Sequence, residues 1–259
     1  FISKDGYPLQ YIKFAEKDAP VHHNLSLNQA DTEAVLIDDL QKRGINILWN
    51  HLVNIDLNNQ IKVSNGLKLT AEFIIAADGR NSDIRNFLGI EAEHSLDDEI
   101  SFGCDATICT SSPLDHSNMH QLFSQEGRVV FVPLPGANRF KISGTYSKTM
   151  GRHNVPDEEM LSKMIFRRSG IKVTQMNDIF LYRLGSIKSD ELYKENVALA
   201  GDAAQTFYPN GGFGLNTAVQ QAYHLAELIG SGTLDPLAKY QSHWMPEIER
   251  RFGIMRSLR

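Results

Sequence analysis

The stretch "LAGDAAQTFYPNGGFGLN", residues 199–216, decides the fold that we predict for this chain. It reads as an apolar strand ending at Gly201-Asp202, a polar loop that contains Pro209, and a helix that begins near Gly212–Gly214. In a doubly wound sheet, ligands bind where strand ends meet helix starts, and the free N–H groups there suit an anion or a polarised carbonyl. An ordinary connection in which Asp202 caps a turn explains the same residues equally well. This stretch alone therefore leaves both interpretations open.

A second stretch, "AADGRNSDIR" at residues 76–85, repeats the arrangement. A buried strand runs into Asp78-Gly79, and a polar loop leads to a short helix that carries Ser82 and Arg85. The alternative is a capped turn with a surface ion pair, which contributes about 0–1 kcal/mol. We call such a strand–loop–helix segment a station. Two stations in one chain are harder to explain as ordinary connections than a single one.

The residues before position 97 predict alternating helices and strands. A short strand is expected at 9–16, and a helix over 30–44, where apolar residues recur at helical spacing and Gly44 supplies a stop signal. Strands are expected at 46–57 and 61–69. The apolar run at 71–79 is typical of a strand covered on both faces.

From about residue 97 to 190 strand-like stretches dominate, with one helical stretch near 156–167, which indicates a mostly antiparallel sheet. After the buried strand near 200, one helix follows and a second is expected over 234–252. Apolar residues in the first of these helices predict its buried face: Leu215, Ala218, Val219, Ala222, Leu225, Ala226 and Ile229. We therefore predict an α/β fold in which residues 1–92 and 191–259 form one discontinuous domain, and residues 93–190 form an inserted, mostly antiparallel sheet domain.

Composition excludes several classes of protein. Among 259 residues, 42% are apolar and 22% are charged, which argues against wholesale disorder, and a net charge of −5 argues against a broad nucleic-acid surface. No apolar run has the roughly 18–20 residues that a bilayer span needs, and no signal peptide is visible at the start. Cys104 and Cys109 are interpreted as buried apolar side chains on opposite faces of a strand in a reducing cytosol. We therefore expect a cytoplasmic protein without an integral membrane segment. A metal site is not expected either, because His116 and His120 lie in a polar loop-to-strand region with no helix to align them.

The two stations together resemble a known family. "ADGRNSDIR" is similar to the Asp-Gly motif of FAD-dependent aromatic hydroxylases of the para-hydroxybenzoate hydroxylase type, and the stretch 199–229 is similar to their Gly-Asp motif. The resemblance covers most of the chain, from Gln29 to about residue 231. It implies a Rossmann-like FAD-binding domain with an inserted antiparallel substrate domain.

The resemblance also implies roles for individual residues. Asp202 would accept hydrogen bonds from the ribityl chain of FAD, and Pro209 would lie on the loop beside the isoalloxazine ring. Asp78 and Arg85 would lie near the pyrophosphate and the NAD(P)H path. The residues assigned to catalysis are Pro209, Gly212 and Gly214, and those assigned to cofactor binding are Gln29, Asp78, Gly79, Arg85, Gly201, Asp202, Pro209, Gly211, Gly212, Gly214, Leu215 and Asn216. Arg183 resembles an arginine frequent before the Gly-Asp strand. His120, Gln121, Phe131 and Pro133 are candidate walls of the substrate pocket.

The implied activity is hydroxylation of an aromatic, phenolic or polyketide-like small molecule by an FAD-dependent monooxygenase. NAD(P)H would reduce FAD, and reduced flavin would react with O2 to give the C4a-hydroperoxide that transfers one oxygen atom. The expected partners are the aromatic substrate and O2, and a homodimer stays open. The alternatives are a truncated or degenerate homologue that binds a small molecule or partner without turnover, and a flavin-dependent reductase or halogenase.

Three features depart from the family pattern. The Gly-x-Gly-x-x-Gly fingerprint is absent, and the resemblance implies roughly 80 further residues before Phe1 that would carry it. Gln205 stands where histidine is common in the Gly-Asp motif, and Gln221 replaces an acidic residue after the flavin loop. We expect these changes to leave contact with FAD intact and to weaken its binding.

Overall fold

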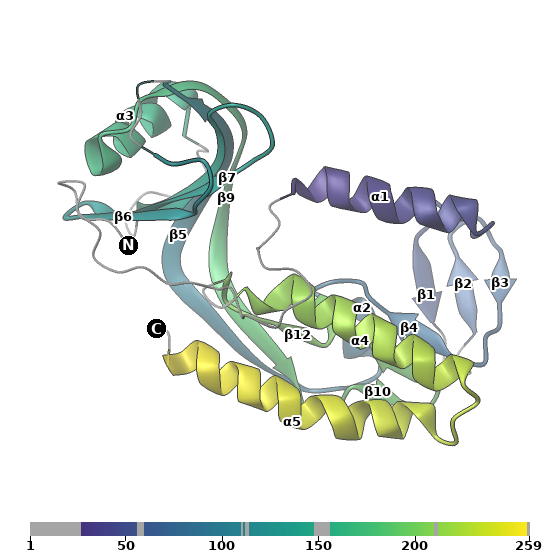
Figure 1. Ribbon diagram of the computed structural model, residues 1–259. Coiled ribbons are helices and arrows are strands. Elements are labelled where there is room, and N and C mark those ends of the chain that lie inside the picture. Colours follow the sequence, from purple (N-terminus) through teal and green to yellow (C-terminus); the bar gives the residue numbers. More distant parts are fainter. Residues whose placement is uncertain are drawn as a thin grey trace. The chain divides into compact units, whose positions relative to one another are not determined.

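The computed structural model describes residues 27–55, 60–109, 111, 114–147, 156–209 and 212–257 (Figure 1). The predicted strand at 9–16 and the cofactor residue Gly211 lie outside these residues. The chain divides into two compact units, one of residues 1–47 and 98–183 and the other of residues 48–97 and 184–259. Both units are discontinuous in sequence. The predicted domain limits of 1–92, 93–190 and 191–259 stay a prediction.

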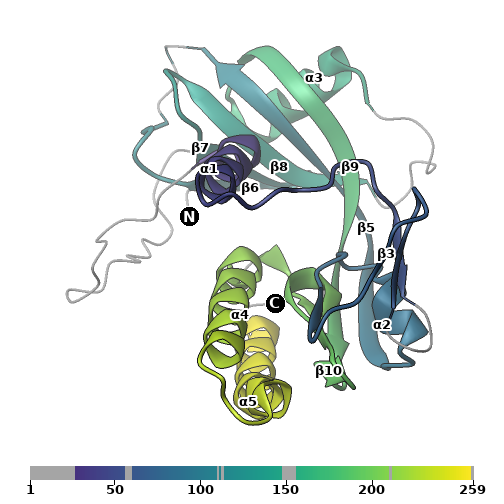
Figure 2. The same ribbon diagram turned by 90° about the vertical axis from the view of Figure 1, so that its right-hand side faces the viewer.

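The second unit contains a small α/β layer (Figure 1). Strand β4 (Ile74–Ala76) pairs in parallel with β11 (Val197–Leu199), and β10 (Tyr193–Lys194) continues the sheet as an antiparallel edge. Helices α4 (Phe213–Gly230) and α5 (Pro236–Ser257) run side by side in both views (Figures 1 and 2). The core between these helices and β11 includes Leu199, Leu225, Tyr240, Trp244 and Ile248.

Shorter elements complete this unit. The antiparallel strands β1, β2 and β3 form a separate sheet in that order, so the predicted strands at 46–57 and 61–69 are real but much shorter. These elements are β1 (Val53–Ile55), β2 (Ile61–Val63), β3 (Lys68–Leu69), α2 (Asp83–Phe87), the 3₁₀ helix η1 (Gly201–Ala203) and β12 (Gln205–Thr206).

The first unit is dominated by an antiparallel sheet, as the sequence predicts. The strand order is β12-β9-β5-β8-β7-β6, and the long strands β5 and β9 each continue from one unit into the other. Cys104 of β5 lies opposite Ile142 of β8, which lies opposite Phe131 of β7. The elements are α1 (Gln29–Lys42), β5 (Ala92–Ile108), β6 (His120–Ser124), β7 (Gly127–Pro133), β8 (Arg139–Ser147), α3 (Glu158–Ser169) and β9 (Val173–Ser189).

Helix α3 covers one face of this sheet. Leu161 and Ile165 of α3 are fully buried in the same cluster as Phe102, Phe131 and Ile142 from the strands. Alternation along β8 places Phe140 and Ile142 in this core and leaves Lys141 and Ser143 on the opposite face. The unit therefore has its own core and one face that α3 does not cover.

Two expectations about burial are wrong, those for Ile75 and Cys109, and the expected burial of Cys104 is confirmed. Ile75 of β4 is 48% exposed between buried Ile74 and Ala76, so this strand is covered on one face only. Cys104 is fully buried, and burial raises the pKa of its thiol to about 12. Cys109, by contrast, is only half-buried, and its sulfur contacts the Ser111 hydroxyl.

The buried face of α4 also differs from the expected one. Leu225 is buried as predicted, but Leu215 is 67% exposed and Val219 is exposed, whereas Thr217 and Gln221 are buried. Thr217, Gln221 and Leu225 are spaced by four, so they form a single stripe. Polar partners on neighbouring elements explain why this stripe, rather than the more apolar one, faces inward.

Candidate flavin site

The Gly-Asp turn follows directly after the buried strand β11. Gly201 adopts φ 60°, a left-handed conformation that glycine reaches without strain, and the Ala204 N–H donates to the Gly201 carbonyl over 3.0 Å. Ala203 and Ala204 are fully buried, whereas Asp202, which precedes them, is exposed. The turn thus anchors its small residues in the core and leaves one carboxylate at the surface of the unit.

The Asp202 carboxyl has a pKa above its ordinary value. Partial loss of solvent around the carboxylate raises the pKa, and the positive charge of Arg80 partly offsets this. The carboxylate is nonetheless surface-accessible, with Arg80 as a nearby countercharge. A carboxylate in this setting can accept hydrogen bonds from hydroxyl groups of a ligand.

The Asp-Gly loop is built as a capped helix start. The Ser82 hydroxyl donates to Asp78 Oδ1 over 2.5 Å, and the Ile84 N–H donates to Asp78 Oδ2 over 3.1 Å. The Ser82 oxygen accepts the N–H of Arg85, which makes it the N-cap of α2. Gly79 has φ 86°, where a side chain would be strained. Both oxygens of Asp78 therefore take part in the local structure, and its assignment to the cofactor stays a prediction.

Arg85 joins the two motifs. Its side chain is only 2% exposed; Nη1 donates to the Ala203 carbonyl over 2.9 Å, and Nη2 donates to the Arg80 carbonyl over 3.1 Å. The bond between Arg85 and Ala203 joins residues that are 118 positions apart. They come together because β4 and β11 are parallel neighbours whose carboxyl ends lie at the same edge of the sheet. The alternative of an exposed surface ion pair is therefore wrong for Arg85. Its predicted contact with the pyrophosphate is not tested.

The loop before α4 is held at both ends by aromatic residues. Phe207 is buried against Phe213, with ring centroids 5.8 Å apart, and against Phe252 at 4.7 Å. Tyr208 is also buried, and its hydroxyl donates to Asp97 over 3.1 Å. Pro209, the next residue, is exposed. These contacts thus hold Phe207 and Tyr208 in the core, while Pro209 is exposed.

The first turn of α4 has unoccupied hydrogen-bonding capacity. Gly212, its N-cap, lies at φ 63° and supplies no side-chain oxygen, and no side chain of the described residues caps the first N–H groups. A Cβ built on Gly212 or Gly214 would meet no atom of the described residues within 4 Å. Leu215 is exposed, and the Asn216 side chain donates to the Gly212 carbonyl over 3.0 Å. Open space and free N–H groups at a helix start are what an anionic ligand edge requires.

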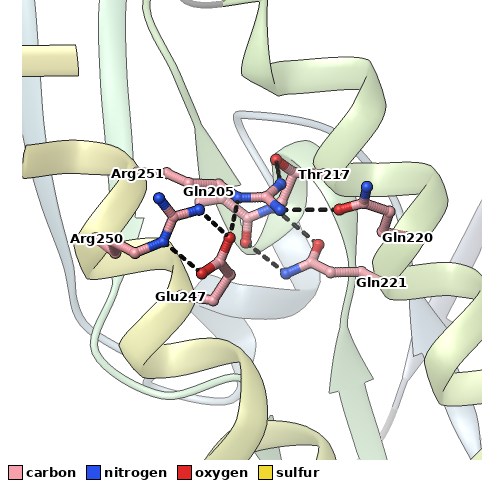
Figure 3. A network of polar contacts seen from close by, with 7 residues as sticks. All are labelled: Gln205, Thr217, Gln220, Gln221, Glu247, Arg250 and Arg251. Carbon is pink, nitrogen blue, oxygen red and sulfur yellow. Dashed lines mark hydrogen bonds and ion pairs between the residues drawn. The ribbon is translucent and has the colours of Figure 1, made fainter. Parts of the chain in front are cut away.

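Sequence reasoning missed one feature of the site, a buried pair of amides. Gln205 and Gln221, treated above only as departures from the family pattern, donate to each other over 2.8 and 3.0 Å (Figure 3). Gln221 Oε1 also accepts the N–H of Gly201 over 3.1 Å. The available signal was the four-residue spacing of Thr217 and Gln221 within an apolar helix.

The remaining predicted site residues lie in the first unit or are buried away from any surface. Gln29 begins α1, where its amide donates to Glu33 over 2.8 Å, and it belongs to the other unit, as does Arg183. His120 and Phe131 are buried in the core beneath α3, and His120 Nε2 donates to the Asp115 carbonyl, so their interpretation as pocket walls is wrong.

Two kinds of structure are absent from the described part of the chain. No group of three histidine, cysteine or acidic side chains there is arranged to hold a metal ion. Among its helices, none combines the length and the apolar character required to cross a bilayer.

Comparison with known proteins assigns the class. Residues 10–240 match the family described as FAD binding domain. The chain belongs to this FAD-binding family, and the resemblance to FAD-dependent aromatic hydroxylases is confirmed. It is 27% identical over 263 residues to the "Uncharacterized aromatic compound monooxygenase YhjG" of Bacillus subtilis, which covers 95% of this chain and 51% of that protein. Curated relatives from Streptomyces rimosus and Mycobacteroides abscessus are also named monooxygenases. The chain spans about half the length of the curated relatives that it matches, or less.

Solved structures share the fold. The Diels-Alderase PyrE3 aligns with a TM-score of 0.74 at 17% identity over 88% of this chain and 52% of that one. Aklavinone-11 hydroxylase, solved with FAD and aklavinone, aligns with a TM-score of 0.66 at 20% identity over 78% and 41%. The predicted Rossmann-like FAD-binding fold with an antiparallel sheet is therefore confirmed.

Proposed function

We propose that this chain is the part of an FAD-dependent monooxygenase that holds the flavin and its substrate. The enzyme would hydroxylate an aromatic, phenolic or polyketide-like small molecule with NAD(P)H and O2. Bound FAD would supply the oxygen activation, through a flavin C4a-hydroperoxide. The observation that carries the proposal is the pairing of an accessible carboxylate, Asp202, with the uncapped and open start of α4 in the same unit.

The residues present fit a flavin. Asp202 would accept hydrogen bonds from ribityl hydroxyls, and the N–H groups after Gly212 would face the N1–C2=O edge, where reduced flavin carries negative charge. Absence of a Cβ at Gly212 and Gly214 would let a flat ring approach the backbone. Exposed Pro209 would lie next to that ring. These assignments are supported by the local geometry and by membership in the FAD-binding family.

The face of the first unit's sheet opposite α3 supports an aromatic substrate. Phe180 is 42% exposed there, and its ring centroid lies 5.6 Å from that of Tyr182. The ammonium group of Lys141 lies 5.7 Å from the Phe180 centroid and 3.6 Å from Asp105 Oδ1, so its charge is balanced. Exposed aromatic rings of this kind would favour a planar aromatic substrate. We propose this face, in place of His120 and Phe131, as the substrate surface of the first unit.

The visible spectrum of the purified chain tests the proposal. We expect a yellow protein, or one that becomes yellow with added FAD, whose flavin bands are bleached by NADPH without air and restored by air. Oxygen incorporation into a panel of phenols, followed by mass spectrometry, would then define the substrate class. A chain that stays colourless and does not quench FAD fluorescence would overturn the proposal. Binding of FAD without bleaching by NADPH or NADH would instead support binding without turnover.

A further inference from the structure

We infer that Gln221, paired with Gln205, is a positioning residue that fixes the Gly201–Asp202 turn against α4, and that the pair works because both members are neutral amides. This inference rests on the proposed function, since its purpose is to align two groups that would contact the flavin. We call the two side chains the amide pair. Neither residue was assigned a role from the sequence.

The amide pair is buried, and each of its side-chain N and O atoms has a hydrogen-bond partner. Gln205 is 2% exposed and Gln221 is 0% exposed. Gln205 Nε2 donates to Gln221 Oε1 over 2.8 Å, and Gln221 Nε2 donates back to Gln205 Oε1 over 3.0 Å. The orientation of both amides is thereby determined, because Gln221 Oε1 must also accept the N–H of Gly201 over 3.1 Å.

This contact acts on the turn that presents Asp202. A Cβ on Gly201 would lie 3.4 Å from the Cβ of Ala218, so the turn packs closely against α4. The Gly201 N–H immediately precedes Asp202 and is held by Gln221, a residue of that helix. The same helix begins at Phe213 with the free N–H groups of the proposed flavin edge. A shift at Gln221 would therefore change the distance between the two groups that would hold the flavin.

Helix α4 is also fixed by contacts with α5. Arg251 donates through Nη1 to the Thr217 hydroxyl and through Nη2 to Gln220 Oε1 over 2.8 Å (Figure 3). Glu247 accepts from Arg251 Nε over 2.7 Å. Thr217 and Gln221 are one helical turn apart, so the α5 contacts and the amide pair together restrict rotation of α4 about its axis.

The surroundings of the amide pair leave little to compensate a charge. From α5, Arg251 and Glu247 face this region, and they bond each other. Lys188 of β9 lies opposite Gln205 in the strand register, and its Nζ bonds Glu249 over 2.7 Å. On the turn itself, the negative charge of Asp202 is partly offset by Arg80, and Arg85 donates to the Ala203 carbonyl. A carboxylate at position 221 would have no solvent and would oppose the Gln205 oxygen, whereas a protonated carboxyl could donate to it.

Substitution of Gln221 by Glu should make FAD affinity depend on pH, because the new carboxyl group can lose its proton. We would measure the FAD dissociation constant by fluorescence quenching from pH 5.5 to 8.5 for the wild type, Gln221→Glu and the control Gln220→Glu. The control adds the same charge one position earlier, at an exposed site that still accepts from Arg251. At each pH we would take the ratio of the FAD dissociation constant of Gln221→Glu to that of the wild type. This ratio should be about tenfold larger at pH 8.5 than at pH 5.5, which corresponds to the loss of one hydrogen bond. Gln220→Glu should follow the wild type.

Two outcomes of the binding experiment would overturn the inference. One is a Gln221→Glu variant whose affinity ratio to the wild type is the same at all pH values, and the other is a Gln220→Glu variant with the same pH profile. Amide hydrogen exchange of Gly201 in the FAD-free chain gives a second readout. It should accelerate with rising pH in Gln221→Glu beyond the intrinsic increase seen in the control, and unchanged protection would also overturn the inference. If the wild type binds no FAD, the proposed function fails, while the exchange of Gly201 still tests the role of Gln221.

Discussion

Asp202 and Arg85 show how two charged residues that look alike in the sequence take different roles. Both lie next to a strand–loop–helix station, and both were assigned to the cofactor. Arg85 is buried with its Nη1 and Nη2 groups on backbone carbonyls, so it connects the two stations. Asp202 is exposed, and among the described residues its carboxylate does not cap a helix start as the carboxylate of Asp78 does. The accessible carboxylate is therefore the one suited to a ligand.

Removal of the Asp202 carboxylate should weaken FAD binding. We expect Asp202→Ala to raise the FAD dissociation constant about tenfold at pH 7.5, because one or two hydrogen bonds to a charged group are lost. In the wild type, affinity should fall as the pH decreases through the raised pKa of Asp202, where the carboxylate takes up a proton. Equilibrium dialysis with FAD measures both effects. Asp190→Ala, at an exposed site in the same unit, is the control, and equal affinities of the Asp202 variant and the wild type would contradict the ribityl role.

At the scale of elements, the pairing of α4 with α5 shapes the site most strongly. The inward stripe of α4 carries Thr217 and Gln221, because α5 presents Arg251 to the first and the Gly-Asp turn presents its N–H to the second. Arg251 also lies over the ring of Trp244, 5.5 Å from its centroid. Polar contacts of this kind select one face of a helix over a more apolar one, since a buried donor without a partner costs about 1–3 kcal/mol.

Glu247 should make the α4–α5 pair acid-sensitive. Hydrogen bonds from Arg250 and Arg251 lower the pKa of Glu247 to about 2, against an ordinary value of 4.5. A lowered pKa in the folded chain means that the stabilisation is present above about pH 4.5 and is lost as the pH falls towards 2. Glu247→Gln should therefore lower the melting temperature at pH 7 by several degrees, and this difference should shrink steadily between pH 4.5 and 2.5. Thermal scans by circular dichroism measure it.

The control for this prediction is Glu159→Gln, which removes an exposed ion pair with Lys163 on α3. An exposed pair of this kind contributes about 0–1 kcal/mol, so the melting temperature should change little at any pH. A constant difference between Glu247→Gln and the wild type from pH 7 to 2.5 would show that the Glu247 contacts do not depend on its charge.

At the scale of the whole molecule, the described residues form two separate hydrophobic cores. One lies between β11, α4 and α5, and the other lies between α3 and the antiparallel sheet. Apart from Gln29, every described residue assigned to the cofactor belongs to the second unit, which contains the core between β11, α4 and α5. This division separates the residues proposed for the flavin from the sheet face proposed for the substrate.

Core truncations should distinguish the two units. Leu225→Ala in α4 and Leu161→Ala in α3 remove leucines that are both fully buried, and each should lower the unfolding free energy by about 2–5 kcal/mol. FAD affinity under native conditions should fall for Leu225→Ala, because α4 carries the proposed flavin amides, and should stay near the wild-type value for Leu161→Ala. Urea unfolding and FAD titration provide the two measurements. Equal losses of affinity in both variants would contradict the assignment of the flavin contacts to the second unit.

The sequence by itself determined the order of elements, the antiparallel sheet and the two strand–loop–helix stations, because hydrophobic periodicity and glycine positions are local signals. It also supplied Asp202 and the glycines of the α4 start. Only the tertiary structure decided which face of α4 is buried, that Arg85 lies inside the fold, and that Gln205 and Gln221 form a pair. These features depend on partners far apart in the chain, 118 positions for Arg85 and Ala203, and no local pattern encodes which distant group will satisfy a buried polar atom.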